Sequence, residues 1–171
     1  MQGRRLENSN NPNAWTAVAY GKGSWIMHML RRRMGDAQFT KMLAELRRRY
    51  EWKTIDTEQF RILCAEFMPK DSRDPKLESF FDQWVYGTGI PALKMEYSVK
   101  GKPGALKLTG TVTQTEVPED FSVTVPIEIQ TGRGKVVKLV QTSSEGASFS
   151  VPVTLPTAKA LLDPGSSVLR R

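Results

Sequence analysis

The spacing of apolar residues along the chain changes near residue 90. Before that point, apolar residues recur every three or four positions, which places them on one face of an α-helix. After it, they alternate with polar residues, which places them on one face of a β-strand. The pattern predicts an α+β chain, in which an N-terminal α-helical segment is followed by an all-β immunoglobulin-like sandwich of about seven strands.

Four helices are predicted in the first half. One runs from about Lys22 to Met34, although glycines at its start weaken the helix there. The other three begin at residues that can cap or open a helix, namely Asp36, Thr57 and the pair Asp74-Pro75. The inward-facing residues of the first helix are expected to be Ile26, Met29 and Leu30.

The second half contains alternating runs separated by turn residues. Val137 and Leu139 are the inward-facing pair expected in one of them, and two short strands are expected near Leu161 and Val168. Proline lacks the N–H that a strand donates to its neighbour, so Pro126 and Pro152 are expected at sheet edges or bulges.

These patterns divide the chain of 171 residues into three parts. Residues 1–13 are a polar lead-in that we expect to be disordered or derived from an expression vector. Residues 14–90 form the helical segment, and residues 91–171 form the β-sandwich domain.

The formal net charge of +7 raises the question of a nucleic-acid partner. The excess of basic residues is +4 in residues 1–90 and +3 in residues 91–171, so it is spread evenly and forms no stripe. Two triplets, Arg31-Arg32-Arg33 and Arg47-Arg48-Arg49, each lie at the end of a predicted helix, where cations interact favourably with the helix dipole. Nucleic acid is therefore not expected as a partner, and no apolar run approaches the length of a membrane span.

The residues that could carry chemistry are few. A catalytic metal site usually needs at least three protein ligands, and this chain has one histidine, His28, and one cysteine, Cys64. His28 lies between methionines on a predicted helix and is expected to be a packing or surface residue. A serine triad would need the same histidine beside a nucleophile elbow, which is missing. No self-sufficient active site, and no bound cofactor or metal, is expected in this chain.

A series of short motifs nevertheless resembles the segment that follows the zinc site in the aminopeptidase N family of zinc metallopeptidases. The series has a Tyr-x-Lys-Gly element, a helix pair ending near a tyrosine, a Trp-containing helix closing with Gly-x-Pro, and a late Asp-Pro step. Its members here are Tyr20-Gly21-Lys22-Gly23, Met29-Leu30, Gly35-Asp36, Phe39, Tyr50, Thr57, Phe60, Phe80, Trp84, Gly89-Ile90-Pro91 and Asp163-Pro164. The resemblance covers residues 14–171 and implies that the helices are the end of a gluzincin-type catalytic domain.

The resemblance implies a catalytic role for Tyr20. The matching tyrosine in the family donates a hydrogen bond to the oxyanion of the tetrahedral intermediate, while zinc and a glutamate-activated water carry out the attack. Taken alone, Tyr20 would be interpreted as a buried tyrosine at a helix start. The family's His-Glu-x-x-His helix, its third glutamate ligand and its Gly-x-Met-Glu-Asn element are absent from this chain.

The sequence therefore favours a fragment of a zinc-dependent aminopeptidase that removes N-terminal residues from peptides. Zinc and peptide substrate would belong to the complete enzyme, and the fragment alone is expected to be inactive. Its expected partner is the remainder of its own catalytic domain. Without that partner, the helix bearing Trp25, Ile26, Met29 and Leu30 is expected to expose apolar surface. The fragment should then either self-associate through its helical half or hold that half loosely. The alternative is a non-catalytic scaffold or protein-binding β-sandwich module derived from the same fold.

Overall fold

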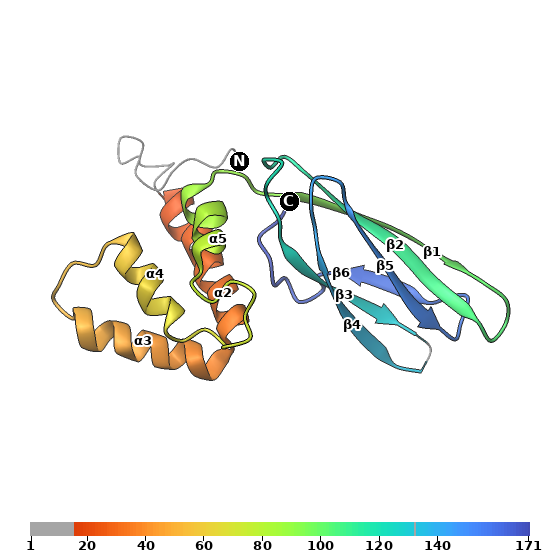
Figure 1. Ribbon diagram of the computed structural model, residues 1–171, viewed down its shortest axis with the longest axis horizontal. Coiled ribbons are helices and arrows are strands. Elements are labelled where there is room, and N and C mark those ends of the chain that lie inside the picture. The colour runs from red at the N-terminus through yellow and green to blue at the C-terminus, as the bar shows by residue number, and fades with distance from the viewer. Residues whose placement is uncertain (1–15, 132) are drawn as a thin grey trace. The chain divides into compact units, whose positions relative to one another are not determined.

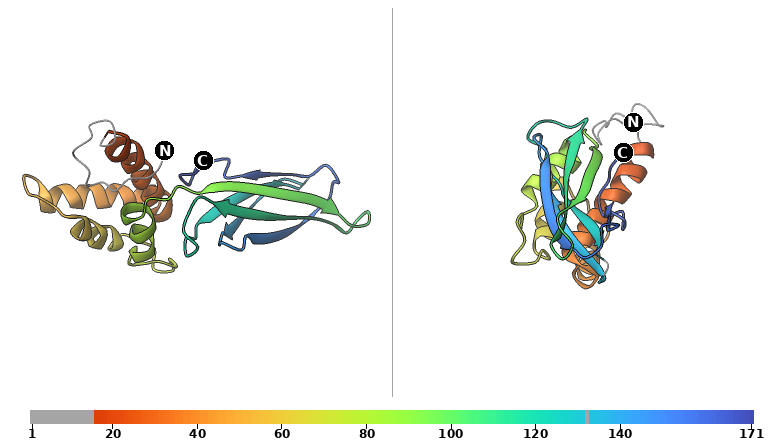
Figure 2. Two further views of the ribbon diagram at one scale, coloured as in Figure 1. Left: turned by 90° about the horizontal axis from the view of Figure 1, so that it is seen from above. Right: turned by 90° about the vertical axis from the view of Figure 1, so that its right-hand side faces the viewer.

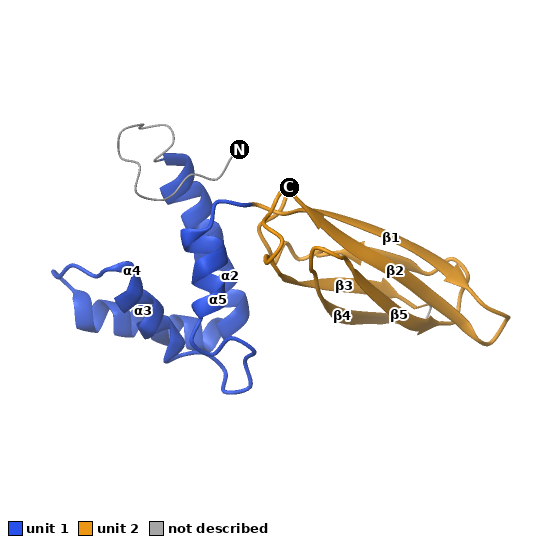
Figure 3. Ribbon diagram, turned by 45° about the horizontal axis from the view of Figure 1, so that its top comes forward, with its two compact units in different colours: residues 1–89 blue, residues 90–171 orange. Residues whose placement is uncertain are grey.

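The computed structural model describes residues 16–131 and 133–171. The chain divides into two compact units, Met1–Gly89 and Ile90–Arg171 (Figure 3). Helices form the first unit, and six strands in two antiparallel sheets form the second (Figure 1). The predicted α+β class is confirmed. The expected lead-in over residues 1–13 lies outside the described residues.

The first unit begins with a π-helix, η1 (Ala17–Lys22), that runs directly into α2 (Gly23–Met34). Two further helices, α3 (Asp36–Tyr50) and α4 (Thr57–Ala65), follow. A short helix, α5 (Glu78–Phe81), continues without a break into a second π-helix, η2 (Asp82–Tyr86). The helix predicted over Lys22–Met34 is confirmed, whereas both π-helices are additions that the apolar spacing did not predict. No helix among the described residues is long and apolar enough to cross a membrane.

The core of the helical unit draws side chains from every α-helix. Ile26, Met29 and Leu30 of α2 are at most 6% exposed, as the periodicity predicts. Each buried side chain of this size stabilises the fold by about 1.5–3 kcal/mol. The expectation that this helix exposes its apolar surface is therefore wrong for these three residues. Their main core companions are Met34, Met42, Leu63, Cys64, Leu77, Phe80, Phe81 and Trp84.

Two helix starts differ from the sequence-based predictions by one residue. Gly35, with a φ of 80° that suits glycine, occupies the cap position of α3, so Asp36 is the first helical residue. Asp56 caps α4 in place of Thr57, because its carboxylate accepts from the Gln59 N–H at 2.7 Å. The Gln59 side chain accepts in return from the Asp56 N–H at 3.0 Å, which completes a capping box.

The pair Asp74-Pro75 does not open a helix. The helix begins only at Glu78, because Leu77 adopts a left-handed backbone with a φ of 58° while its side chain is fully buried. Asp74 still binds a backbone donor in the first turn of α5, since its Oδ2 accepts from the Phe80 N–H at 2.9 Å. Burial of Leu77 thus overrides the local preference for a proline at the first helical position.

The second unit is a sandwich of two three-stranded sheets (Figure 2). One sheet has the order β1-β2-β5, made of Ala92–Lys100, Leu106–Thr115 and Ala147–Val153. The other has the order β4-β3-β6, made of Lys135–Gln141, Thr124–Gln130 and Lys159–Leu162. The inner faces meet in a core that includes Leu108, Val112, Val125, Ile127 and Ile129, each 0% exposed.

The described residues contain six strands, not about seven. The short strand expected near Leu161 is β6, but no strand forms near Val168. There the buried Asp163 carboxylate accepts from the N–H groups of Ser167 at 2.8 Å and Val168 at 3.1 Å. This side chain satisfies backbone donors that a neighbouring strand would otherwise have to pair.

The expected inward orientation of Val137 and Leu139 is wrong. They are 61% and 67% exposed, because β4 turns its other face, with Val140, toward the core. Val140 pairs with Val125 in the register, whereas Leu139 pairs with Pro126 on the outer face. The run Val136-Val137-Lys138-Leu139-Val140 supplies apolar residues to both faces, so alternation alone could not decide between them.

The two strand prolines behave differently. Pro152 lies in the edge strand β5, as predicted. Pro126 lies in the central strand β3, which contradicts the prediction for it. Its carbonyl accepts from the Asp163 N–H at 2.8 Å, just beyond the last pair of the ladder to β6. Its missing donor therefore costs a single bond at the end of a ladder.

The capping assignment can be tested by two neighbouring substitutions. Asp56→Ala should lower the free energy of unfolding by about 1 kcal/mol, because it removes the capping side chain. The matched control, Thr57→Ala, should change it by less than about 0.5 kcal/mol. Urea unfolding followed by circular dichroism measures both. A larger loss for Thr57→Ala would contradict Asp56 as the cap.

The buried Cys64 thiol gives a second test of the helical core. Its side chain is 0% exposed, and burial raises the pKa of the Cys64 thiol to about 12. At pH 8 the folded chain should therefore react with a small thiol reagent about 100-fold or more slowly than the chain in urea. The unfolded rate should rise as pH approaches 9 while the folded rate stays low. Equal rates in the two states would show that this core is open.

Candidate functional site

Tyr20 lies on the exposed side of the π-helix η1. Its side chain is 64% exposed, so the interpretation as a buried core tyrosine is wrong. The neighbouring Gly21 is also exposed, and a Cβ built there would meet nothing within 4 Å. The phenol is thus presented to solvent beside a position that carries no side chain.

The backbone around Tyr20 is held by two donors. The Gly23 N–H donates both to the Val18 carbonyl, five residues back, and to the Tyr20 carbonyl. The Ser24 hydroxyl donates to the same Tyr20 carbonyl. The hydrogen bond of a π-turn spans five residues, one more than that of an α-turn, and such turns occur frequently at functional sites. The extra residue changes the direction in which the Tyr20 side chain leaves the helix.

Lys22, two residues after Tyr20, has the opposite environment. Its side chain is 7% exposed, and its ammonium donates to the Gly87 carbonyl oxygen at 2.7 Å. Burial lowers the pKa of the Lys22 ammonium below its usual value. Sequence alone placed Lys22 in the Tyr-x-Lys-Gly element and at the start of the first predicted helix, and its contact with a residue 65 positions away went unpredicted.

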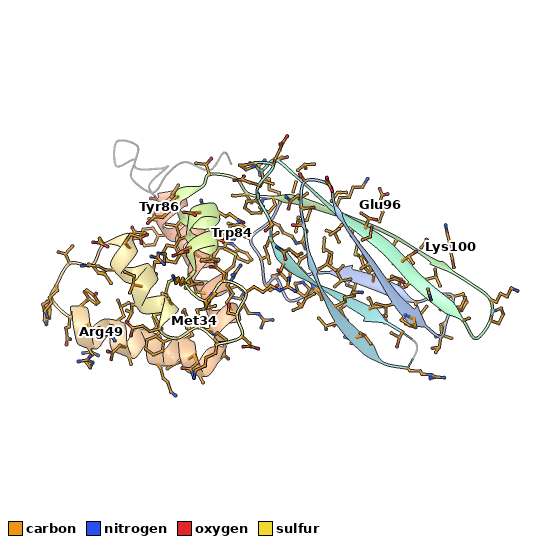
Figure 4. All side chains as sticks on the ribbon, viewed as in Figure 1. Met34, Arg49, Trp84, Tyr86, Glu96 and Lys100 are labelled. Atoms are coloured by element: carbon orange, nitrogen blue, oxygen red, sulfur yellow. The ribbon has the colours of Figure 1, made fainter. Side chains whose placement is uncertain are left out.

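The acceptor of this bond sits at the end of η2. The Gly87 N–H donates to the Asp82 carbonyl at 2.8 Å, which closes the π-helix. A Cβ at Gly87 would lie 2.5 Å from the Gln83 carbonyl oxygen, so this position requires glycine. The preceding turn carries Trp84, 1% exposed, and Tyr86, both labelled in Figure 4. Lys22 therefore joins the two π-helices of the unit.

Neither His28 nor Cys64 forms a nucleophilic site. His28 is half-buried and packs edge-to-face against Trp25, with 5.6 Å between ring centroids. This contact agrees with the packing role expected for it. Cys64 is buried in the core, and its thiol has a raised pKa, which disfavours the reactive thiolate.

Residues 16–131 and 133–171 contain no group of three or more His, Cys, Asp or Glu side chains that could hold a metal ion. A zinc ion in a peptidase needs such a group. The described part of the chain therefore does not fit a zinc site.

The sandwich has an open hollow of about 680 Å³. Residues of β1, β2 and β5 line it together with Lys138 of β4. Its side chains are mainly serine and threonine hydroxyls, with Glu96 and Lys138 as the charged groups. This set contains no histidine or thiol that could serve as a general base or nucleophile.

Comparison with known proteins shows what the helical unit is similar to. The model of the peptidase family M1 domain matches residues 4–84. Aminopeptidase N of Lactococcus lactis subsp. lactis is 34% identical over 81 residues, which cover 47% of this chain and 9% of that protein. A leukotriene A-4 hydrolase homolog of Botryotinia fuckeliana is 28% identical over 89 residues, which cover 51% of this chain and 14% of that protein. The chain thus spans about a tenth of the length of these curated relatives.

A solved structure shares the fold. The crystal structure of Legionella pneumophila aminopeptidase A in complex with aspartic acid superposes with a TM-score of 0.64. The match covers 93% of this chain and 18% of that chain, at 18% sequence identity, and so concerns the fold alone. Together with the two sequence relatives, it agrees with the match to the family model. The helical part of this chain is therefore similar to the peptidase family M1 domain, and the comparisons together support a C-terminal fragment of an aminopeptidase of that family.

Proposed function

We propose that the complete protein is a zinc-dependent aminopeptidase that removes N-terminal residues from peptides, and that Tyr20 stabilises the oxyanion of its transition state. The observation that supports this role is the exposed phenol of Tyr20 on a π-turn, anchored two residues later by the buried Lys22. A tyrosine kept only for packing would be buried, whereas Tyr20 is 64% exposed.

The chemistry suits a phenol. Phenols remain protonated at neutral pH and can therefore donate a hydrogen bond to a developing negative charge. When a peptide carbonyl is attacked, its oxygen gains that charge, and a donor already in place there stabilises the transition state more than the substrate. One such donor contributes roughly 3 kcal/mol to lowering the barrier.

Similarity to the peptidase family M1 domain implies zinc in the complete enzyme. No group of three or more His, Cys, Asp or Glu side chains that could hold a metal ion lies among the described residues, and we propose that the zinc ligands come from the remainder of the catalytic domain. The peptide substrate would then lie between Tyr20 and residues outside the described chain. We accordingly assign residues 14–90 to the end of the catalytic domain and residues 91–171 to the β-sandwich domain.

The alternative remains a non-catalytic scaffold or protein-binding sandwich of the same ancestry. The coding sequence upstream of residue 1 separates the two. A His-Glu-x-x-His element there supports the peptidase, because its two histidines bind zinc and its glutamate activates water. Its absence from an intact upstream reading frame would support the scaffold.

The role of Tyr20 can be tested in the complete enzyme. Tyr20→Phe should lower kcat by about 10²–10³-fold with a smaller change in KM, because the hydroxyl acts mainly in the transition state. Steady-state hydrolysis of an aminoacyl p-nitroanilide measures both constants. Tyr97→Phe in the sandwich, also an exposed tyrosine, is the matched control and should leave both unchanged. A Tyr20→Phe enzyme with near-normal kcat would reduce Tyr20 to a surface residue.

The 171-residue chain alone should retain no stoichiometric zinc after chelation and gel filtration, because the described residues cannot assemble three ligands. It should also fail to hydrolyse the aminoacyl substrate. Metal analysis of the purified chain and a rate measurement check these outcomes. One zinc per chain surviving chelation would overturn the assignment of the ligands to the rest of the enzyme.

A further inference from the structure

We infer that Lys22 is a positioning residue for Tyr20: its buried ammonium, bound to the Gly87 carbonyl, sets the π-turn that aims the catalytic phenol. This inference rests on the proposed role of Tyr20 in peptide hydrolysis. Lys22 does not itself touch substrate, because its side chain points into the fold and is only 7% exposed.

The burial of Lys22 needs a reason. Removing an ammonium from water costs several kcal/mol unless its interactions in the protein replace the lost hydration. A methionine or leucine at this position would fill similar space at no such cost. The hydrogen bond of 2.7 Å to the Gly87 carbonyl is the interaction that a hydrocarbon side chain cannot reproduce.

The acceptor is fixed more firmly than an ordinary loop carbonyl. The Gly87 N–H is bound to the Asp82 carbonyl at 2.8 Å, and the close approach of the Gln83 carbonyl leaves no room for a Cβ. The end of η2 thus offers a carbonyl at a defined place. Because Lys22 is the last residue of η1, its hydrogen bond fixes the end of η1 relative to that carbonyl.

The connection from Lys22 to Tyr20 is short. Only Gly21 separates the two residues, and a Cβ built at Gly21 would meet nothing within 4 Å. The phenol leaves the same π-helix, Ala17–Lys22, that ends at the anchored Lys22, so the path of this backbone contributes to the direction of the phenol. A displacement of about 1 Å in a catalytic group can cost about 10²-fold in rate. Loss of the Lys22 bond should therefore lower the rate through Tyr20.

A double-mutant cycle in the complete enzyme tests this. Lys22→Met should lower kcat by about 10–100-fold with KM changed less than about 3-fold. The double variant Tyr20→Phe/Lys22→Met should be no more than about 2-fold slower than Tyr20→Phe alone, because Lys22 has no hydroxyl left to position. Lys41→Met, at an exposed lysine of α3, is the matched control and should leave the rate unchanged.

Two results would overturn the inference about Lys22. One is a Lys22→Met enzyme with near-normal kcat while Tyr20→Phe loses activity. The other is a double variant whose losses multiply, which would mean that Lys22 acts independently of Tyr20. A Tyr20→Phe enzyme with normal activity would instead contradict the proposed function.

A second variant and a second readout keep the test valid if Lys22→Met destabilises the enzyme. Gly87→Ala disturbs the acceptor without changing Lys22, and it should show the same absence of additivity with Tyr20→Phe. In the 171-residue chain, Lys22→Met should speed amide hydrogen exchange at residues 17–23 and leave residues 36–50 unchanged. If both variants fail to fold, Lys22 is a stability residue and the inference is wrong.

Discussion

The hydrogen bond from Lys22 to the Gly87 carbonyl is the constraint on which the helical unit depends. It joins segments 65 residues apart, so α3 and α4 must fold back between fixed ends. The ion pairs on those helices are weaker constraints. Arg49 binds Glu45 and Glu66 at 2.6–2.8 Å, but all three side chains are partly exposed, and pairs of this kind contribute about 0–1 kcal/mol. Breaking a buried charged hydrogen bond costs more than such a surface pair supplies.

The sandwich relies on a buried polar network. The Gln114 amide donates to the Phe121 carbonyl at 2.6 Å, and the Thr142 hydroxyl donates to the Gln114 side-chain oxygen at 2.5 Å. The Val123 N–H donates to the same hydroxyl at 3.2 Å. These bonds connect β2 of one sheet with the segments before β3 and after β4 of the other. Because each group is paired, the network adds specificity to the apolar core without leaving a buried group unsatisfied.

The sequence predicted the features that depend on long-range periodicity and missed those that depend on one packing choice. The inward face of α2 follows from the spacing of Ile26, Met29 and Leu30. The orientation of β4 does not, because paired apolar residues suit either face and only Val140 packing against the other strands decides. For the site, resemblance singled out Tyr20, but the contact of the buried Lys22 ammonium with Gly87, at the end of η2, is tertiary. No local pattern encodes a contact between Lys22 and Gly87.

The outer edge of β5 has a consequence for how molecules of this chain meet at high concentration. Pro152 offers no N–H along that edge, and Lys138 donates to the Ser150 carbonyl at 3.1 Å. The backbone groups of residues two apart on a strand point to the same side, so both sites face an incoming strand. An incoming strand would find no N–H donor at Pro152. At Ser150 it would compete with the Lys138 ammonium for the carbonyl oxygen. This edge therefore resists amyloid-like stacking, which is a hazard of any sheet with an open side.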